Sequence, residues 1–484
     1  MRCKGVGGKL TRGLTGRQLK FLSEEEIRKI HEISLRILEE VGVKSTSKRI
    51  LEVLSRSGID VNVDKGIARI SRSHVEEALK KAPKRIVIYG RSQENAVILE
   101  NGRVYFGLGG TPTPYILDVE SGEFRRPGVR DVAEATRLGD SLSNIDFIMT
   151  IAGAFDVPYE VEYLYEWKTI LSNTSKPIVY PAPGIINAEK VVRMGIAIAG
   201  NEDEFRRKPI FGVYVEMPSP LTLHDANENI IVLAEKEVPI VIGQMPQLGA
   251  TAPVTFAGAA ALSNAENLAA LTLTQIINPG APFIYGGYVT LMDQKTGRCA
   301  YGAPEFAMGN IVDSALATYY GLPCFGWGGC SDSKEPDVQA GVEVMMNSLV
   351  AALSGVNLIH DFGYLAGGSV GSMEMAVIGN EVAGMIKRIL MGIKVDDEDL
   401  AFNVVKDIGP SGHFLSHPHT LKHLRSEIYM PEIFNRDSEA KWIRSGKPSV
   451  RNSIKRRVRE ILKTHNPEPL PEDIQRKIEE IIRN

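Results

Sequence analysis

The chain is poor in cysteine and has no long hydrophobic run. Cys3, Cys299, Cys324 and Cys330 are too few and too irregularly spaced for a disulfide framework or a zinc ribbon, so they indicate a reducing cytoplasm. The basic N-terminus lacks the apolar segment that follows it in a secretory signal. No stretch reaches the roughly 18 uncharged apolar residues that a membrane-spanning helix needs. We therefore expect a soluble, cytoplasmic protein with no membrane association.

An excess of charge of either sign is also missing. The 56 lysines and arginines nearly balance the 59 aspartates and glutamates, which leaves a net charge of −3. This balance disfavours nucleic-acid binding as the main role. The basic run Lys455–Arg459 lies in an amphipathic segment, where a solvated helix face or a subunit contact explains it better than nucleic acid does. We expect no nucleic-acid partner, and we expect a homo-oligomer.

Phosphate-binding motifs are absent as well. The chain has no G-x-x-x-x-G-K-[ST] sequence. The glycine-rich stretches GLGGTPTP at 107–114 and GWGGCSD at 326–332 lack the strand, G-x-G-x-x-G and helix that frame a dinucleotide site. A nucleotide cofactor is therefore not expected.

What the chain does contain is a regular series of short apolar segments, each separated from the next by a helix-sized stretch. Near-continuous apolar runs are typical of parallel strands that are buried on both faces. Eight of them alternating with helices predict an α/β fold, the (β/α)8 or TIM barrel, with its chemistry at the carboxyl ends of the strands. The segments are Val104–Gly107, Phe147–Gly153, Pro177–Tyr180, Pro209–Val215, Pro239–Gln244, Pro282–Gly287, Leu322–Trp327 and Asn357–Asp361.

The barrel is expected to carry additions at both ends. Residues 1–100 are predicted to form an N-terminal arm and helical cap, in which Ser23 and Glu26 fit a capping box and Gly42 fits a helix end. The barrel is assigned to residues 101–395. Residues 396–484 are assigned to a His-rich loop and a helical extension.

Four of the nine histidines lie close together in the C-terminal part: His413, His417, His419 and His423. His419 and His423 have the spacing of two ligands on one helix face. The segment lies outside the barrel strands and contains no H-E-x-x-H motif, so a metal site is the weaker interpretation. The stronger one is a loop ordered by hydrogen-bonded imidazoles, folded over the barrel mouth or a neighbouring subunit.

Aromatic and polar residues gather where the predicted strands end. Aromatic faces hold a quaternary ammonium group without requiring a hydrogen bond, so such a rim suits a methylated cation. Each single ring is better explained by packing, and it is the concentration on one rim that favours binding. The residues are Tyr180, Tyr214, Tyr285, Tyr288, Trp327 and Tyr364, with Glu216, Gln244, Asp332, His360 and Asp361 among them.

Two strand ends stand out. Gly326, Gly328 and Gly329 would let the backbone pass close to a ligand or to another protein surface. His360 and Asp361 are adjacent, so in a strand they should face opposite ways, with one of them looking into the barrel. A protonated His360 can donate to a carboxylate, which makes it the best candidate for holding an acidic group of the substrate.

Several long segments resemble one known family. FGWGGCSDSKEPDVQAGVE, LSGVNLIHDFGYLAGG, GPSGHFLSHPHTLKH and LRILEEVGV are similar to sequences of the trimethylamine methyltransferase family, which includes glycine betaine:corrinoid methyltransferases. The resemblance covers nearly the whole chain. It implies a (β/α)8 barrel that moves a methyl group from an amine to the Co(I) of a corrinoid, and it implies that a separate small corrinoid-binding protein carries this cofactor.

Founding members of the family use pyrrolysine in the glycine-rich region after the seventh strand. Here Gly328, Gly329 and Cys330 occupy that region. The chain is therefore similar to the branch without pyrrolysine, which implies a quaternary amine such as glycine betaine as substrate. Because Co(I) is the nucleophile, no catalytic side chain and no metal ligand are expected.

Site residues are assigned on this basis. The corrinoid-approach loop is Gly328, Gly329, Cys330 and Asp332, and the substrate-binding residues are His360, Trp327, Tyr214, Glu216, Gln244, Tyr288, Tyr180 and Tyr364. Two other functions stay open. One is a betaine-binding protein without catalysis. The other is a metal-dependent barrel hydrolase or lyase that uses the cluster from His413 to His423.

Overall fold

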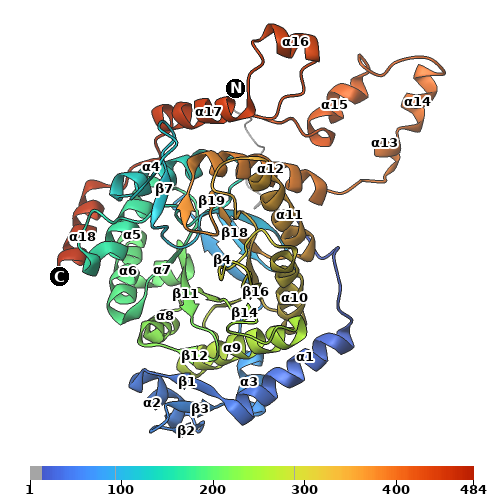
Figure 1. Ribbon diagram of the computed structural model, residues 1–484. Helices are drawn as coiled ribbons and strands as arrows, with labels where there is room; N and C mark the ends of the chain where they lie inside the picture. The colour runs from blue at the N-terminus through green and yellow to red at the C-terminus, as the bar shows by residue number, and fades with distance from the viewer. Residues whose placement is uncertain (1–13, 93, 288) are drawn as a thin grey trace.

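Eight parallel strands close into a barrel in the computed structural model, which describes residues 14–92, 94–287 and 289–484 (Figure 1). The strand order around the barrel is β10-β11-β13-β15-β17-β18-β6-β9, so chain neighbours are spatial neighbours. Each predicted apolar segment overlaps one of them, which confirms the (β/α)8 fold. The strands are β6 (Tyr105–Leu108), β9 (Phe147–Ile148), β10 (Ile178–Pro181), β11 (Phe211–Met217), β13 (Ile240–Gln244), β15 (Phe283–Gly286), β17 (Cys324–Trp327) and β18 (Leu358–Phe362).

Helices surround the barrel and return the chain to the next strand. The longest of them, α9 (Phe256–Ile277), is buried along most of its length because the N-terminal unit packs on its outer side. The others are α4 (Val129–Ser141), α5 (Glu162–Asn173), α6 (Gly184–Ala199), α7 (Glu202–Arg207), α8 (Asn229–Glu235), α10 (Pro304–Tyr320), α11 (Val338–Ser354) and α12 (Met373–Leu390), with short 3-10 turns at Tyr159–Val161 and Asp225–Glu228.

The N-terminal unit packs against the side of the barrel. Its first helix, α1 (Glu24–Arg36), starts with the predicted capping box and continues in a π-turn at Ile37–Val41, after which Gly42 adopts a φ of 83°. Helices α1 and α3 lie on α9. The remaining elements are β1 (Val43–Ser45), α2 (Lys48–Arg56), β2 (Asp60–Asn62), β3 (Ile67–Arg69), α3 (Arg72–Lys81), β4 (Ile86–Tyr89) and β5 (Ala96–Leu99).

Small sheets are built from the loops that follow the barrel strands. The loops after β6 and β18 contribute the four-stranded sheet β19-β20-β7-β8, and the loops after β13 and β15 contribute the pair β14-β16. These loops therefore shape the barrel mouth. The strands are β7 (Tyr115–Leu117), β8 (Phe124–Arg125), β12 (Thr222–Leu223), β14 (Gln247–Leu248), β16 (Thr290–Leu291), β19 (Tyr364–Leu365) and β20 (Val370–Gly371), of which β12 pairs with β1.

The C-terminal extension divides into two parts. Helices α17 (Val450–Thr464) and α18 (Glu472–Arg483) lie on the barrel helices, the first on α12 and α4 and the second on α6. The other helices, α13 (Asp397–Leu400), α14 (Phe402–Ile408), α15 (Pro418–Glu427) and α16 (Glu439–Arg444), project away from the barrel (Figure 1). The His-rich segment therefore does not fold over the mouth of its own barrel.

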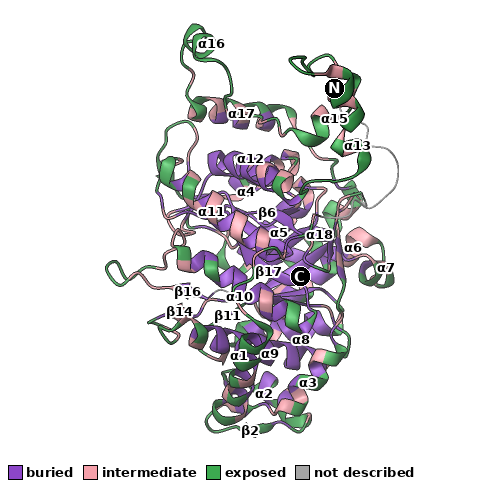
Figure 2. Cartoon of the chain, turned by 90° about the vertical axis from the view of Figure 1, so that its right-hand side faces the viewer, coloured by how far each residue is buried: buried purple, intermediate pink, exposed green. Residues whose placement is uncertain are grey.

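Burial follows this division. The barrel and the α9 region are largely buried, whereas the projecting helices contain no buried residue and are coloured green and pink in Figure 2. Throughout the described ranges, each helix is too short or too polar to cross a bilayer.

Candidate active site at the barrel mouth

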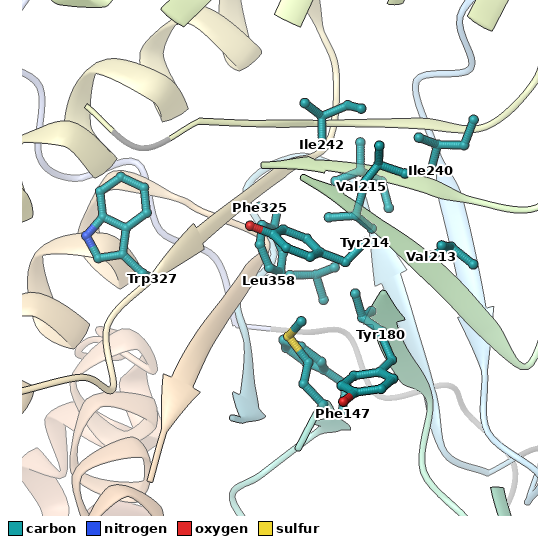
Figure 3. Packing of buried hydrophobic residues seen from close by; sticks show 14 of the residues in the cluster. Phe147, Tyr180, Val213, Tyr214, Val215, Ile240, Ile242, Phe325, Trp327 and Leu358 are labelled. Atoms are coloured by element: carbon teal, nitrogen blue, oxygen red, sulfur yellow. The ribbon is translucent and has the colours of Figure 1, made fainter. Parts of the chain in front are cut away.

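Three rings from three strands meet inside the barrel and form what we call the ring cluster: Tyr214, Phe325 and His360. The Phe325 ring stacks on the His360 imidazole with centroids 4.3 Å apart, and the Tyr214 ring lies 5.5 Å from Phe325. Figure 3 shows Tyr214 beside Phe325 in the barrel interior. A Cβ at Gly243 would lie 2.2 Å from the Tyr214 hydroxyl, so this glycine makes room for the tyrosine. The cluster thus offers aromatic faces within the barrel.

His360 and Asp361 face each other, and the prediction that they point to opposite sides is wrong. The Nδ1 of His360 lies 2.8 Å from the Oδ1 of Asp361 and 3.3 Å from the carbonyl oxygen of Gly109. The reason is a β-bulge in β18, where the register against β6 shifts and Asp361 adopts a φ of 74°. A bulge re-aims side chains that would otherwise alternate. The imidazole is consequently oriented from its Nδ1 side by a buried carboxylate.

Glu216 lies on the same face of β11 as Tyr214, two residues nearer the mouth. Its side chain is accessible to solvent, whereas its strand neighbours Val215 and Met217 are buried. The surrounding protein still desolvates the carboxyl in part, and this desolvation raises its pKa. The pKa of Tyr163 and that of Tyr364 are raised first by burial and further by the charge of Glu216. A carboxylate therefore stands among tyrosines at the mouth.

Tyr301 completes this group from the long loop after β15. Its hydroxyl donates to the Sδ of Met245 at 3.8 Å. Burial raises the pKa of Tyr301 well above its usual value, and the nearby Cys299 and Asp361 raise it further. Asp332 holds this loop in place, because its carboxylate accepts hydrogen bonds from the backbone N–H of Tyr301 at 3.0 Å and of Gly302 at 2.8 Å.

Two of the residues assigned to substrate binding lie on the outer side of their strands. Tyr180 pairs in register with the outward Val213, and its hydroxyl donates to Glu166 of α5 at 2.8 Å. Gln244 donates from its amide to the carbonyl oxygen of Ser263 in α9 at 3.0 Å. The structure therefore places both side chains between the strands and the surrounding helices, apart from the ring cluster.

Trp327 is also separate from the ring cluster. Its ring is fully buried and packs on Phe306 of α10, with centroids 4.6 Å apart. Figure 3 shows it well away from Tyr214 and Phe325. Phe306 in turn contacts Tyr301 at 4.7 Å, so Trp327 lies behind the mouth as a supporting ring. Tyr288, the remaining aromatic residue assigned to the substrate, lies outside the described residues.

The glycine-rich loop after β17 packs against β18. The N–H groups of Gly328 and Gly329 donate to the carbonyl oxygen of His360 at 3.1 and 3.0 Å. A Cβ at Gly329 would lie 2.2 Å from the backbone nitrogen of Phe362. Cys330 is also buried, and its backbone forms an isolated β-bridge with that of Tyr364. These residues therefore support the position of His360 from behind, and this close approach explains the glycines.

Tyr364 ties the mouth sheet to the barrel. Its hydroxyl donates to the carbonyl oxygen of Thr150 at 3.1 Å and also to that of Thr111. Burial raises the pKa of this hydroxyl well above its usual value. It lies beside the ring cluster, since a Cβ at Gly110 would contact both Tyr364 and Asp361.

The histidines of the C-terminal segment make contacts within that segment. His419 and His423 share a helix face as predicted, with their rings stacked 4.3 Å apart. The Nε2 of His423 lies 3.0 Å from Glu398, and His417 caps α15. No group of three or more His, Cys, Asp or Glu side chains suited to a metal ion occurs in the described parts of the chain.

A closed (β/α)8 barrel whose mouth collects aromatic rings, an imidazole and carboxylates is the architecture of a barrel enzyme. The chain belongs to the trimethylamine methyltransferase (MTTB) family, whose sequence model matches residues 8–484. It is accordingly a methyltransferase.

The chain is similar to several family members over nearly its whole length. It is 35% identical to the trimethylamine methyltransferase MttB of Desulfitobacterium hafniense strain DSM 10664, over 95% of this chain and 92% of that one. It is 32% identical to the glycine betaine methyltransferase of Desulfitobacterium hafniense strain Y51, over 95% and 96%. It is 31% identical to the trimethylamine methyltransferase MttB1 of Methanosarcina mazei, over 99% and 98%.

Proposed function

We propose that this methyltransferase takes a methyl group from a quaternary amine, glycine betaine or a related betaine, and passes it to the Co(I) of a corrinoid that a separate protein carries. One observation of the structure carries this proposal. The ring cluster presents the face of Tyr214 beside the carboxylate of Glu216, and this combination suits a cationic ammonium group that has no N–H to donate.

The reaction needs little acid–base help from the protein. Co(I) attacks the methyl carbon with its electron pair, the C–Co bond forms while the C–N bond breaks, and cobalt is oxidised to Co(III). The nitrogen keeps the bonding pair and leaves as a neutral tertiary amine, so no general acid is required. The chain is left with binding the amine, orienting one N–CH3 bond and excluding water.

Residues of the mouth divide these tasks. The face of Tyr214 and the charge of Glu216 hold the ammonium group, and the fully buried Phe325 supports the His360 ring from behind. His360, held in place by Asp361, donates to the carboxylate of the betaine. Tyr301 and Tyr364 shape the entrance. Trp327, Tyr180 and Gln244 act through packing, and the loop from Gly328 to Asp332 keeps β18 and the loop containing Tyr301 in position.

A screen of amines tests the proposal. The purified protein is mixed with chemically reduced Co(I) cobalamin and, in turn, glycine betaine, carnitine, choline and trimethylamine, and the cobalamin spectrum is followed. We expect conversion to methyl-Co(III) with a quaternary amine. A protein that only binds betaines would bind these amines in calorimetry and leave the Co(I) spectrum unchanged.

A further inference from the structure

A 36-residue excursion, residues 393–428, leaves the barrel after α12 and returns to it, and we call it the arm. It contains α13, α14 and α15, none of which has a buried residue. In Figure 1 the arm stands clear of the barrel helices, and in Figure 2 it is coloured green and pink, as exposed and intermediate residues are. The arm therefore has a folded backbone and no core of its own.

Polar contacts give the arm its shape. Glu398 of α13 bonds to Lys422 and His423 of α15, and the ring of His419 lies 3.3 Å from the Glu398 carbonyl oxygen. Asp396 caps α13. Its return to the barrel is fixed by Arg388 of α12, which donates to the side chain and backbone of Glu427. Contacts of this exposed kind specify a geometry and contribute little stability.

Large apolar side chains cover the outside of the arm. The exposed fraction is 73% for Phe402 and 81% for Leu415, and Ile393, Leu400 and Leu421 are also mainly exposed. With its other apolar residues the arm shows on the order of 1,000 Å² of apolar surface, above the roughly 800 Å² that each partner contributes to a stable interface. A short helical segment without a core needs such a surface to be covered.

A matching apolar groove lies on the barrel between α11 and α12. It has a volume of about 540 Å³, and none of its lining residues belongs to the arm of the same chain. Val338, Val342 and Met345 of α11 form one wall, and Ile378 and Met385 of α12 form the other. Val342 is 62% exposed. Methionines suit such a surface because they adapt to the shape of what binds.

We propose that the arm of one copy of this chain seats in the α11–α12 groove of a second copy, and that the second arm does the same in return. One chain carries both the apolar arm and the apolar groove. A reciprocal exchange in a two-fold dimer therefore covers the arm and the groove of both copies. The arm needs permanent cover because it has no core. A corrinoid carrier protein has to dissociate in every cycle, which favours a more polar interface elsewhere.

Sedimentation velocity of the full-length protein tests the exchange. We expect the wild type to be a dimer at about 10 µM, because this concentration exceeds the dissociation constant of a stable interface. Phe402→Glu and Leu415→Glu in the arm and Val342→Glu in the groove should each raise the dimer dissociation constant at least about tenfold. The control Ile186→Glu changes a 69% exposed residue of α6, and it should leave the dimer intact. Circular dichroism melting separates dissociation from unfolding.

Mixing two variants sharpens the test. Leu415→Glu keeps an intact groove and Val342→Glu keeps an intact arm, so the mixture should form a heterodimer with one complete arm–groove contact. Neither variant alone should dimerise. A monomeric wild type would overturn the proposal, as would arm variants that remain dimers. Dissociation by Leu415→Glu but not by Val342→Glu would also contradict it, since the arm would then bind a different surface.

Discussion

The Nδ1 of His360 lies 2.8 Å from the Oδ1 of Asp361, although the two residues are neighbours in one strand. A bulge with a φ of 74° at Asp361 makes this contact possible. Asp361 therefore orients the imidazole of its neighbour within the ring cluster, where Phe325 stacks on the same ring. A fixed imidazole is suited to hold one end of an extended substrate.

Replacing His360 should separate substrates by whether they carry a carboxylate. A charge-assisted hydrogen bond is worth about 1.5–3 kcal/mol, so His360→Ala should lower kcat/KM for a betaine by roughly one to two orders of magnitude. Choline, which lacks the carboxylate, should lose far less. Steady-state kinetics with both substrates measures the difference. An equal loss for both, or no loss, would contradict the role of His360 as carboxylate anchor.

Glu216→Gln should show the opposite preference. The carboxylate attracts the ammonium group of any substrate and repels the carboxylate of a betaine, so choline should lose more affinity than glycine betaine. We expect a loss of about 1 kcal/mol, roughly fivefold in Kd, for choline. Calorimetric titration of both ligands measures it. If affinity for the two ligands fell by the same factor, Glu216 would have no part in selecting the substrate.

Trp327 and Tyr214 should respond differently to substitution. Trp327 packs on Phe306 without exposure, so Trp327→Ala should reduce the free energy of unfolding by about 3–5 kcal/mol and leave the affinity of the folded protein for the amine nearly unchanged. Tyr214→Leu removes the ring that lies on the same face of β11 as Glu216 and should weaken binding by about 0.5–2 kcal/mol. Urea unfolding and calorimetry give the two quantities. Weaker binding of the amine by folded Trp327→Ala would show that Trp327 belongs to the substrate site.

Stability should fall as the pH rises because of Glu166. Burial raises the pKa of its carboxyl from 4.5 to about 7. The folded state favours the neutral carboxyl. The contribution of Glu166 to the free energy of unfolding is therefore complete below about pH 4.5 and is lost as the pH rises through about 7. The loss is roughly 3 kcal/mol. Unfolding of Glu166→Gln should depend less on pH between 5 and 8.5 than that of wild type or of the surface control Glu160→Gln. Identical profiles for all three proteins would show that Glu166 does not titrate in this range.

The strands were predictable from sequence, and the faces of their end residues were not. An apolar run marks a buried strand, but both faces of a parallel strand are apolar, so the run does not reveal which residues point inward. The sequence therefore assigns Gln244 and Tyr180 to substrate binding, although they face α9 and α5. The bulge at Asp361 depends on packing against β6, which local sequence does not encode.

Another part of the site comes from residues that lie far from the strand ends in the sequence. Tyr163 and Tyr301 reach the mouth from positions well beyond β9 and β15, and no periodicity connects them to a strand. Phe325 stands before the end of β17, within an apolar run in which nothing distinguishes it from a core residue. The tyrosines that follow the strands, in α5 for Tyr163 and in the loop after β15 for Tyr301, were the one signal that could have indicated them.

Methyl transfer by metal-free protein tests the central claim most directly. The protein is treated with a chelator, mixed with Co(I) cobalamin and glycine betaine, and followed by the cobalamin spectrum together with NMR detection of the tertiary amine. The account predicts that methyl-Co(III) and dimethylglycine appear in equal amounts. Strict dependence on added Zn²⁺, or an unchanged Co(I) spectrum with every quaternary amine tested, would contradict it.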